Sequence, residues 1–178
     1  MAVTINGSGT IGGLSAYQQG AGLTLIASQS FSAVSSVSVN NCFSSAYDNY
    51  FILYRATATG ASDIAFRLRS AGTDASSSVY AWGYMDSTTS GYFGQITAQS
   101  QWRIGRCEDS SSYAFGDANI LGPYLSAYTG MTSKATTRQQ GNVALHNGTH
   151  AASTSYDGFS LIFGASTTGS LRVYGYTN

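Results

Sequence analysis

Short runs of alternating apolar and polar residues follow one another along most of the chain. The clearest run covers residues 63–69, where isoleucine, phenylalanine and leucine alternate with Ala65, Arg67 and Arg69. A period of two is typical of a half-buried β-strand. The run 50–55 is apolar on both faces at first, which indicates a central strand that is covered on both sides.

Similar runs recur along the rest of the chain, and about ten to twelve short strands are expected. Turn-forming residues at 59–62 predict a hairpin between the runs 50–55 and 63–69, and residues 164–170 are predicted to be the loop of a second hairpin. The remaining candidate strands are 22–28, 34–39, 78–85, 92–98, 101–107, 113–115, 131–138, 142–152, 159–163 and 171–176. Without a helical pattern or an exact repeat, this spacing predicts an all-β, antiparallel sandwich or barrel.

The N-terminal segment differs from the rest of the chain. Residues 1–20 have no charged side chain, and their glycines alternate with β-branched residues. We therefore predict an N-terminal arm over 1–20 and a single β-domain over 21–178. The segment also lacks the basic and apolar regions of a secretory signal, so we expect synthesis in a cytoplasm without a signal peptide. No apolar run approaches the ~20 residues that cross a bilayer, so no membrane partner is expected.

Charge is scarce. Charged residues make up 9% of the 178 residues and the formal net charge is zero, against roughly 25% charged residues in ordinary globular proteins. The chain has one lysine and one glutamate but 28 serines, 18 threonines and 13 tyrosines. Because there is no basic surplus, nucleic acid is not expected as a partner. A surface of hydroxyls, amides and tyrosines costs little to desolvate, which indicates a protein that works in an assembly; an ordinary polar β-domain is the alternative.

Two motifs resemble known sites as strings only. Residues 7–12 match GxGxxG, but no helix and no acidic residue follow at the spacing that dinucleotide binding needs, so no cofactor is expected. His146 and His150 have the spacing of a helical metal pair, but Asn147–Gly148 between them is the strongest type I′ turn signal. That signal predicts a hairpin with one histidine on each arm, no third ligand is suggested nearby, and no metal is expected.

Little in the sequence indicates catalysis. Glu108 could pair with Asp86 or Asp117 as glycosidase carboxylates do, but nothing in the sequence brings them together, and no nucleophile motif is present. We therefore expect no catalytic residues and no enzyme. Cys42 and Cys107 match no zinc spacing; they are interpreted as buried apolar residues, and a disulfide between them stays open.

Aromatic and arginine side chains supply the remaining candidates. Trp82, Tyr84 and Trp102 are candidate platforms for stacking on sugar rings, while the alternative is that they are semi-buried strand residues. Arg67 and Arg69 share a strand face, with Asp63 two pleats before Arg67. They are candidates either for a subunit contact or for a surface or interface ion pair.

Several segments resemble small virion proteins of tailed bacteriophages. They are residues 4–14, 43–53, 66–74, 156–159 and 171–176, and together they cover about a quarter of the chain. Each segment matches loosely, whereas their shared order is more specific. The resemblance implies a jelly-roll-like β-sandwich, often a homotrimer, attached to the phage particle. The chain departs from long tail fibres in lacking repeats, a coiled-coil shaft and a separate attachment domain, which favours a head decoration or small fibre protein.

The leading hypothesis is therefore a non-enzymatic capsid decoration (cement) protein located in the virion. Its partners would be other copies of itself and the major capsid protein or another virion protein. The alternative is a tail-fibre or receptor-binding module that recognises a host surface glycan. Under the leading hypothesis the N-terminal arm docks on the particle through its apolar residues, which are Val3, Ile5, Ile11, Leu14 and Tyr17.

Overall fold

The computed structural model describes residues 22–87, 92–107, 109–136 and 143–177. These residues form eleven β-strands and no helix. The strands are β1 (Leu23–Val39), β2 (Asn49–Ala58), β3 (Ser62–Ser70), β4 (Thr73–Asp74), β5 (Tyr80–Asp86), β6 (Tyr92–Gln99), β7 (Trp102–Cys107), β8 (Ala114–Leu121), β9 (Thr129–Thr136), β10 (Val143–His150) and β11 (Gly158–Tyr176). Consequently, no helix in the described part of the chain is suited to crossing a membrane.

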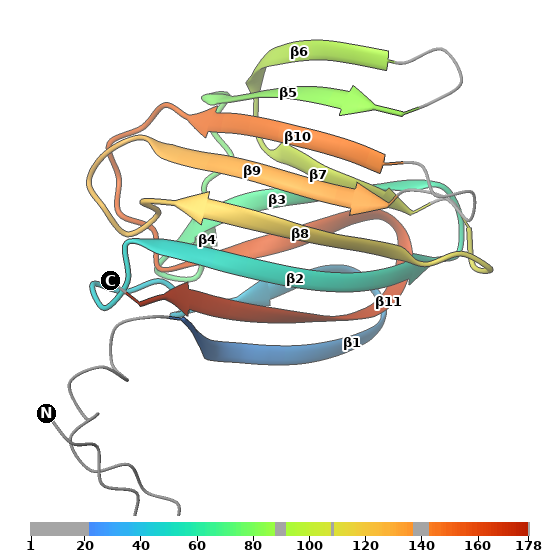
Figure 1. Cartoon of the computed structure of the whole chain (residues 1–178), viewed down its shortest axis with the longest axis horizontal. Helices are drawn as coiled ribbons and strands as arrows, with labels where there is room; N and C mark the ends of the chain where they lie inside the picture. The colour runs from blue at the N-terminus through green and yellow to red at the C-terminus, as the bar shows by residue number, and fades with distance from the viewer. Residues whose placement is uncertain (1–21, 88–91, 108, 137–142, 178) are drawn as a thin grey trace, which may run out of the picture.

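All strand pairs are antiparallel and belong to one curled sheet. Its order is β4-β3-β11-β2-β8-β9-β10-β5-β6, while β1 pairs with β11 and β7 with β3. The sheet folds back on itself, so that β7 packs against β8, β9 and β10 and lies behind them in Figure 1. The expected class, an all-β, jelly-roll-like β-sandwich, is confirmed in this half-barrel form.

We call the layer of β2, β8, β9, β10, β5 and β6 the large sheet, and the layer of β3, β4 and β7 the small sheet. Strand β11 belongs to both, because residues 158–163 pair with β3 and residues 167–175 pair with β2. The side of the large sheet that points away from the small sheet is called the outer face.

The hairpin predicted around residues 164–170 is wrong, because these residues continue β11 as one strand of 19 residues. Their hydroxyls bond to nearby backbone: Thr167 Oγ1 donates to the carbonyl of Ala165 at 2.9 Å, and Thr168 Oγ1 accepts from the Ala33 N–H at 3.0 Å. Gly169 is needed for close packing, since a Cβ there would lie 2.2 Å from the Arg55 carbonyl oxygen. The glycine therefore marks a close backbone approach inside a strand.

The hairpin predicted between β2 and β3 is also wrong. The turn at 59–61 is present, and the Thr59 N–H donates to the Ser166 carbonyl at 2.9 Å. However, the turn carries the chain from the large to the small sheet, and both strands pair with β11 instead of with each other.

A third correction concerns Asn147–Gly148, which lies in the middle of the continuous strand β10. His146 and His150 therefore share the buried face of one strand, where they are 3% and 0% exposed. The glycine makes room for a ring, because a Cβ on Gly148 would lie 2.7 Å from Trp102 Nε1 and 2.7 Å from the Ala81 carbonyl oxygen.

Aromatic rings fill the space between the two sheets. Phe66 stacks on Phe159 at 4.7 Å between ring centroids, and Trp102 meets Tyr80 edge-on at 5.1 Å. All four side chains are fully buried. These rings fix the small sheet against the large one, which leaves the outer face as the broad surface of the molecule.

Candidate functional site

One row of side chains crosses the outer face from strand to strand. The register places each member directly opposite the next on the neighbouring strand. From β11 to β6 the members are Arg172, Leu53, Asp117, Lys134, Leu145, Met85 and Phe93. We call this set the outer row. It spans seven strands, or about 29 Å at the usual strand spacing of about 4.8 Å.

The apolar members of the outer row are open to solvent. Phe93 is 81% exposed, Met85 60%, Leu145 41% and Leu53 38%. Phe115 and Val143, in the next row of the same face, are also exposed. Leu145, Met85 and Phe93 are direct neighbours on adjacent strands. Scattered exposed apolar residues are ordinary, whereas a contiguous apolar strip marks an interaction surface.

The centre of the outer row carries opposite charges. Asp117 on β8 lies opposite Lys134 on β9, yet no ion pair joins these two described side chains. Asp117 Oδ1 is buried and has no hydrogen-bond partner within the described part of the chain. Burial raises the pKa of Asp117, and the charge of Lys134 partly opposes this rise. A second cation close to this carboxylate would therefore stabilise its charged form.

Two hollows adjoin the outer row. The first, of about 370 Å³, has Leu53, Phe115 and Val143 among its walls and includes Asp117 and Lys134. The second, of about 350 Å³, is lined by the large apolar side chains of Trp82, Leu121 and Met131 together with small and uncharged polar residues. The outer face therefore combines apolar ridges with shallow depressions, a relief into which side chains of a partner can fit.

One arginine beside the outer row is already engaged. The Arg55 guanidinium carbon lies 3.8 Å from the ring centroid of Tyr113 and 5.6 Å from that of Phe115. This cation–π contact fixes both rings on the outer face.

The three candidate stacking residues are not equivalent. Trp102 is 0% exposed and donates through Nε1 to the Thr149 carbonyl at 3.1 Å, so its prediction as a sugar platform is wrong. Trp82 and Tyr84 are half-buried on the inner side of β5, with ring centroids 5.4 Å apart. They can reach a ligand only along the part of their rings that remains open.

A polar cluster lies beside these rings. Arg103 of β7 approaches Asp63 in the small sheet at 3.3 Å and Asp86 in the large sheet at 3.8 Å. Behind it, His146 Nδ1 is 3.4 Å from the Ser133 hydroxyl. Burial, with a smaller effect from the charge of Arg103, lowers the pKa of His146 to about 4. The histidine is therefore neutral at physiological pH, and the ion pairs tie the two sheets together.

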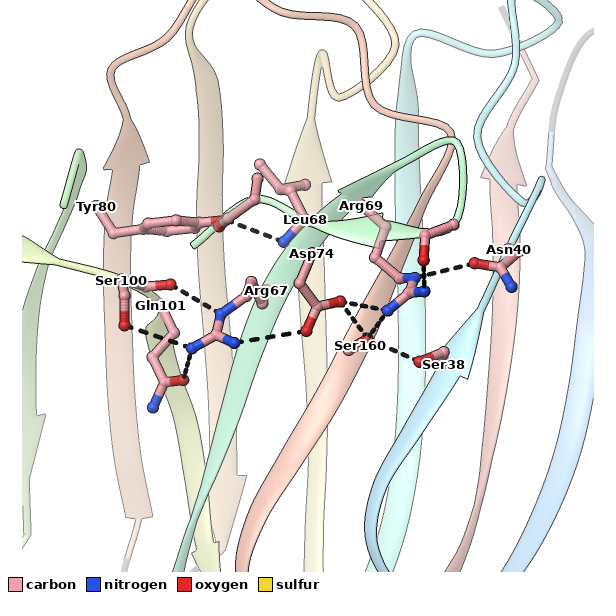
Figure 2. A network of polar contacts seen from close by, with 12 residues as sticks. Ser38, Asn40, Arg67, Leu68, Arg69, Asp74, Tyr80, Ser100, Gln101 and Ser160 are labelled. Atoms are coloured by element: carbon pink, nitrogen blue, oxygen red, sulfur yellow. Dashed lines mark hydrogen bonds and ion pairs between the residues drawn. The ribbon is translucent and has the colours of Figure 1, made fainter. Parts of the chain in front are cut away.

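Arg67 and Arg69 find their partners within the chain, as Figure 2 shows. Both bind Asp74 of β4, whereas Asp63 pairs with Arg103 and Arg106 of β7. Arg67 also donates to the Gln101 side chain at 2.9 Å and to the Ser100 carbonyl at 3.0 Å. Arg69 reaches further partners on β11 and in the segment after β1, donating to Ser160 Oγ and Asn40 Oδ1, each at 2.9 Å. This network joins separate segments of the small-sheet side; a subunit contact through the same arginines stays a prediction.

The described residues contain no cluster of three or more side chains of the metal-binding types His, Cys, Asp and Glu. His146 and His150 pack among rings, with His150 4.2 Å from Tyr80 and His146 6.0 Å from Trp82. Both cysteines are buried free thiols, so no disulfide joins Cys42 and Cys107.

Several sequence candidates lie outside the described residues. They are Glu108 and the five docking candidates Val3, Ile5, Ile11, Leu14 and Tyr17.

The outer row was missed from the sequence, although one signal for it is visible there. Phe51 and Leu53 make the run 50–55 apolar on both faces, which predicted a strand covered on both sides. The inner residues Tyr50, Ile52 and Tyr54 are indeed buried, whereas Leu53 faces solvent. An apolar outer side on this strand is thus a sign of an external contact.

Comparisons with known proteins add little. No family model matches the chain, and no curated protein matches it. A solved seed lectin from Lotus tetragonolobus is similar at 8% identity and a TM-score of 0.23, covering 78% of this chain and 76% of the lectin. A protein of unknown function from Shewanella oneidensis is similar at 8% identity and a TM-score of 0.23, and the match covers 88% of this chain and 77% of the Shewanella chain. At these TM-scores neither similarity carries an argument about function.

Proposed function

We propose that this chain is a non-enzymatic structural protein of a bacteriophage particle, acting as a capsid decoration protein that forms oligomers on the head. The observation that carries the proposal is the exposed apolar strip of the outer row, above all Met85 and Phe93. A protein that works alone in water gains nothing from such a strip and risks aggregation through it. The scarcity of charge and the resemblance to small virion proteins support the same conclusion.

The proposed mechanism is mechanical. Each copy adds contacts between neighbouring capsid subunits, and these contacts oppose expansion of the shell under internal pressure. Single contacts can be weak, since several joined in one oligomer act at a high effective concentration. The uncharged segment 1–20 is proposed to dock on the capsid, because it is too rich in glycine to form a core of its own.

The test starts from particles of the phage that encodes the chain. Quantitative mass spectrometry of purified particles is expected to give a copy number close to that of the major capsid protein. A copy number that is a small fraction of it would instead place the chain on the tail, and absence from the particle would refute the proposal.

The docking segment is tested separately on particles stripped of the protein. Replacing Val3, Ile5 and Leu14 by serine in the full chain is expected to abolish rebinding without changing the melting temperature. A matched control replaces three of the serines or threonines of the same segment by alanine. Wild-type rebinding by the serine variant would refute docking through this segment.

A second candidate function is a tail module that binds a host glycan. The observation that favours it is the half-buried pair Trp82 and Tyr84 beside the Arg103–Asp86 ion pair. Sugar rings stack on aromatic faces while charged groups bond to their hydroxyls. Titration with fragments of the host's surface polysaccharide should then change the tryptophan fluorescence, and Tyr84→Ala should abolish the change. The control Tyr128→Ala alters a tyrosine that is 65% exposed elsewhere, and an equal response in both variants would exclude this site.

A further inference from the structure

We infer that the outer face is the contact between two copies of this chain, arranged so that Asp117 of each copy binds Lys134 of the other. The inference rests on the proposed function for its biological role, and it names the partner of the outer row. A pair of copies of this kind is isologous, which means that the same surface is used on both sides.

The charges of the outer row are complementary to themselves. A two-fold axis that lies in the plane of contact, parallel to the strands and midway between Asp117 and Lys134, turns the two outer faces toward each other and exchanges the two positions. The aspartate of each copy then lies opposite the lysine of the other, and two identical ion pairs form at the centre. The half-buried carboxylate of Asp117, whose Oδ1 has no hydrogen-bond partner in the described part of the chain, then has the ammonium group of the other copy nearby.

Two of the apolar members also face each other under the same operation, whereas Met85 of one copy lies opposite Arg172 of the other. Leu53 and Leu145 flank the central pair on opposite sides, so the axis places Leu53 of one copy against Leu145 of the other. Their partly exposed side chains would then be covered. Since charged residues are depleted and apolar residues enriched at the centre of stable contacts, one charge pair among leucines fits an interface that specifies its register.

The available area is close to that of a stable interface. The outer row is about 29 Å long, and three neighbouring rows give a width of about 20 Å, since residues two apart on a strand are about 7 Å from each other. The projected area is therefore about 600 Å², and the relief of the side chains enlarges it. Stable interfaces bury about 800 Å² on each partner.

Charge reversal tests this arrangement on the purified full-length chain, with the oligomeric state measured by sedimentation equilibrium. The wild type is expected to be a dimer. Asp117→Lys places two lysines opposite each other, and Lys134→Asp places two aspartates opposite each other, so each variant alone should dissociate at least about 100-fold more readily. Thermal melts establish that each variant is folded.

An equimolar mixture of the two variants is the decisive sample. In a mixed pair, the Asp117→Lys copy presents two lysines at the centre and the Lys134→Asp copy presents two aspartates. Each lysine then faces an aspartate, so the mixture should form heterodimers. No effect within a single chain can produce this rescue, because neither variant changes on mixing. Failure of the mixture to associate, while both variants are folded, would overturn the inference.

A pair of leucines provides a matched control. Leu145→Glu lies in the outer row, and Leu125→Glu lies in the segment between β8 and β9; the two leucines are 41% and 48% exposed. Leu145→Glu should abolish the dimer and Leu125→Glu should leave it unchanged. A wild type that is monomeric or trimeric, or a dimer indifferent to Leu145→Glu, would overturn the inference. A monomer that still binds phage particles would leave the proposed function standing, whereas a dimer absent from particles would refute that function alone.

Discussion

Substitution of Gly148 by alanine tests the close contact between Gly148 and Trp102, at the position where the sequence predicted a turn. The added Cβ would lie 2.7 Å from Trp102 Nε1 and 2.7 Å from the Ala81 carbonyl oxygen. The carbonyl belongs to the backbone of the neighbouring strand β5, so it cannot rotate away. Trp102 is fully buried against Tyr80 and Phe66, so its ring can move only by disturbing the core.

The expected cost has three parts. Overpacking of a core costs about 1–3 kcal/mol, and loss of the hydrogen bond from Trp102 Nε1 to the Thr149 carbonyl costs about 1 kcal/mol. The lower backbone entropy of alanine in the unfolded chain offsets this by raising the free energy of unfolding by about 0.5–1 kcal/mol. The free energy of unfolding should therefore fall by about 1–3.5 kcal/mol, and each kcal/mol lowers Tm by roughly 2–4 °C in a domain of this size.

Urea denaturation followed by circular dichroism measures the change, and near-ultraviolet circular dichroism reports the environment of Trp102. The matched control is Gly60→Ala, because a Cβ on Gly60 meets nothing within 4 Å. This control should change the free energy of unfolding by less than about 0.5 kcal/mol. If Gly148→Ala proves as stable as Gly60→Ala, the glycine is not required by the ring and the reasoning is wrong.

Buried polar groups and thiols supply three further predictions. The pKa of His146 is about 4 in the folded state against 6.5 in the unfolded state, so the unfolded chain takes up the proton first as the pH falls. The free energy of unfolding, measured in urea melts, should therefore fall by roughly 3 kcal/mol between pH 6.5 and 4. The same fall should be smaller in His146→Gln. Asp74→Ala leaves two guanidinium groups without their carboxylate and should lower the free energy of unfolding by about 2 kcal/mol. Asp74→Asn should lower it less, because the amide keeps a hydrogen-bond acceptor. Equal losses in the two variants would contradict this account. Cys42 and Cys107 are buried thiols, so a thiol reagent should react with neither until urea unfolds the protein, and a burst of labelling in the native state would contradict the structure.

The fold class could be predicted because the alternation within single strands is a local signal. Ile64, Phe66 and Leu68 are all fully buried, as the run 63–69 predicted. The strand pairing could not be predicted in the same way. Gly148 and Gly169 were interpreted as turn signals. Glycine is needed at these positions because Trp102 lies close to Gly148 and the backbone of β2 lies close to Gly169, and both neighbours are distant in sequence.

The candidate site was harder to predict than the fold. The outer row brings together one residue from each of seven strands, and its continuity depends on the register of six strand pairs. None of its members is unusual within its own strand. Likewise, Arg69 bonds to residues of β4 and β11 and to Asn40. The pattern of residues next to Arg69 in the sequence predicts none of these partners.

The pairing of the first and last strands has a consequence for how the chain can be rearranged. Leu23 lies opposite Tyr176, and Thr177 bonds to the Gly22 carbonyl through both its N–H, at 3.1 Å, and its hydroxyl, at 2.8 Å. The two ends of the described domain are thus adjacent, and a linker of a few residues would join them. Circular permutants opened in the exposed stretch 124–128 should retain the same sandwich, because the order of strands in space does not depend on where the polypeptide is cut.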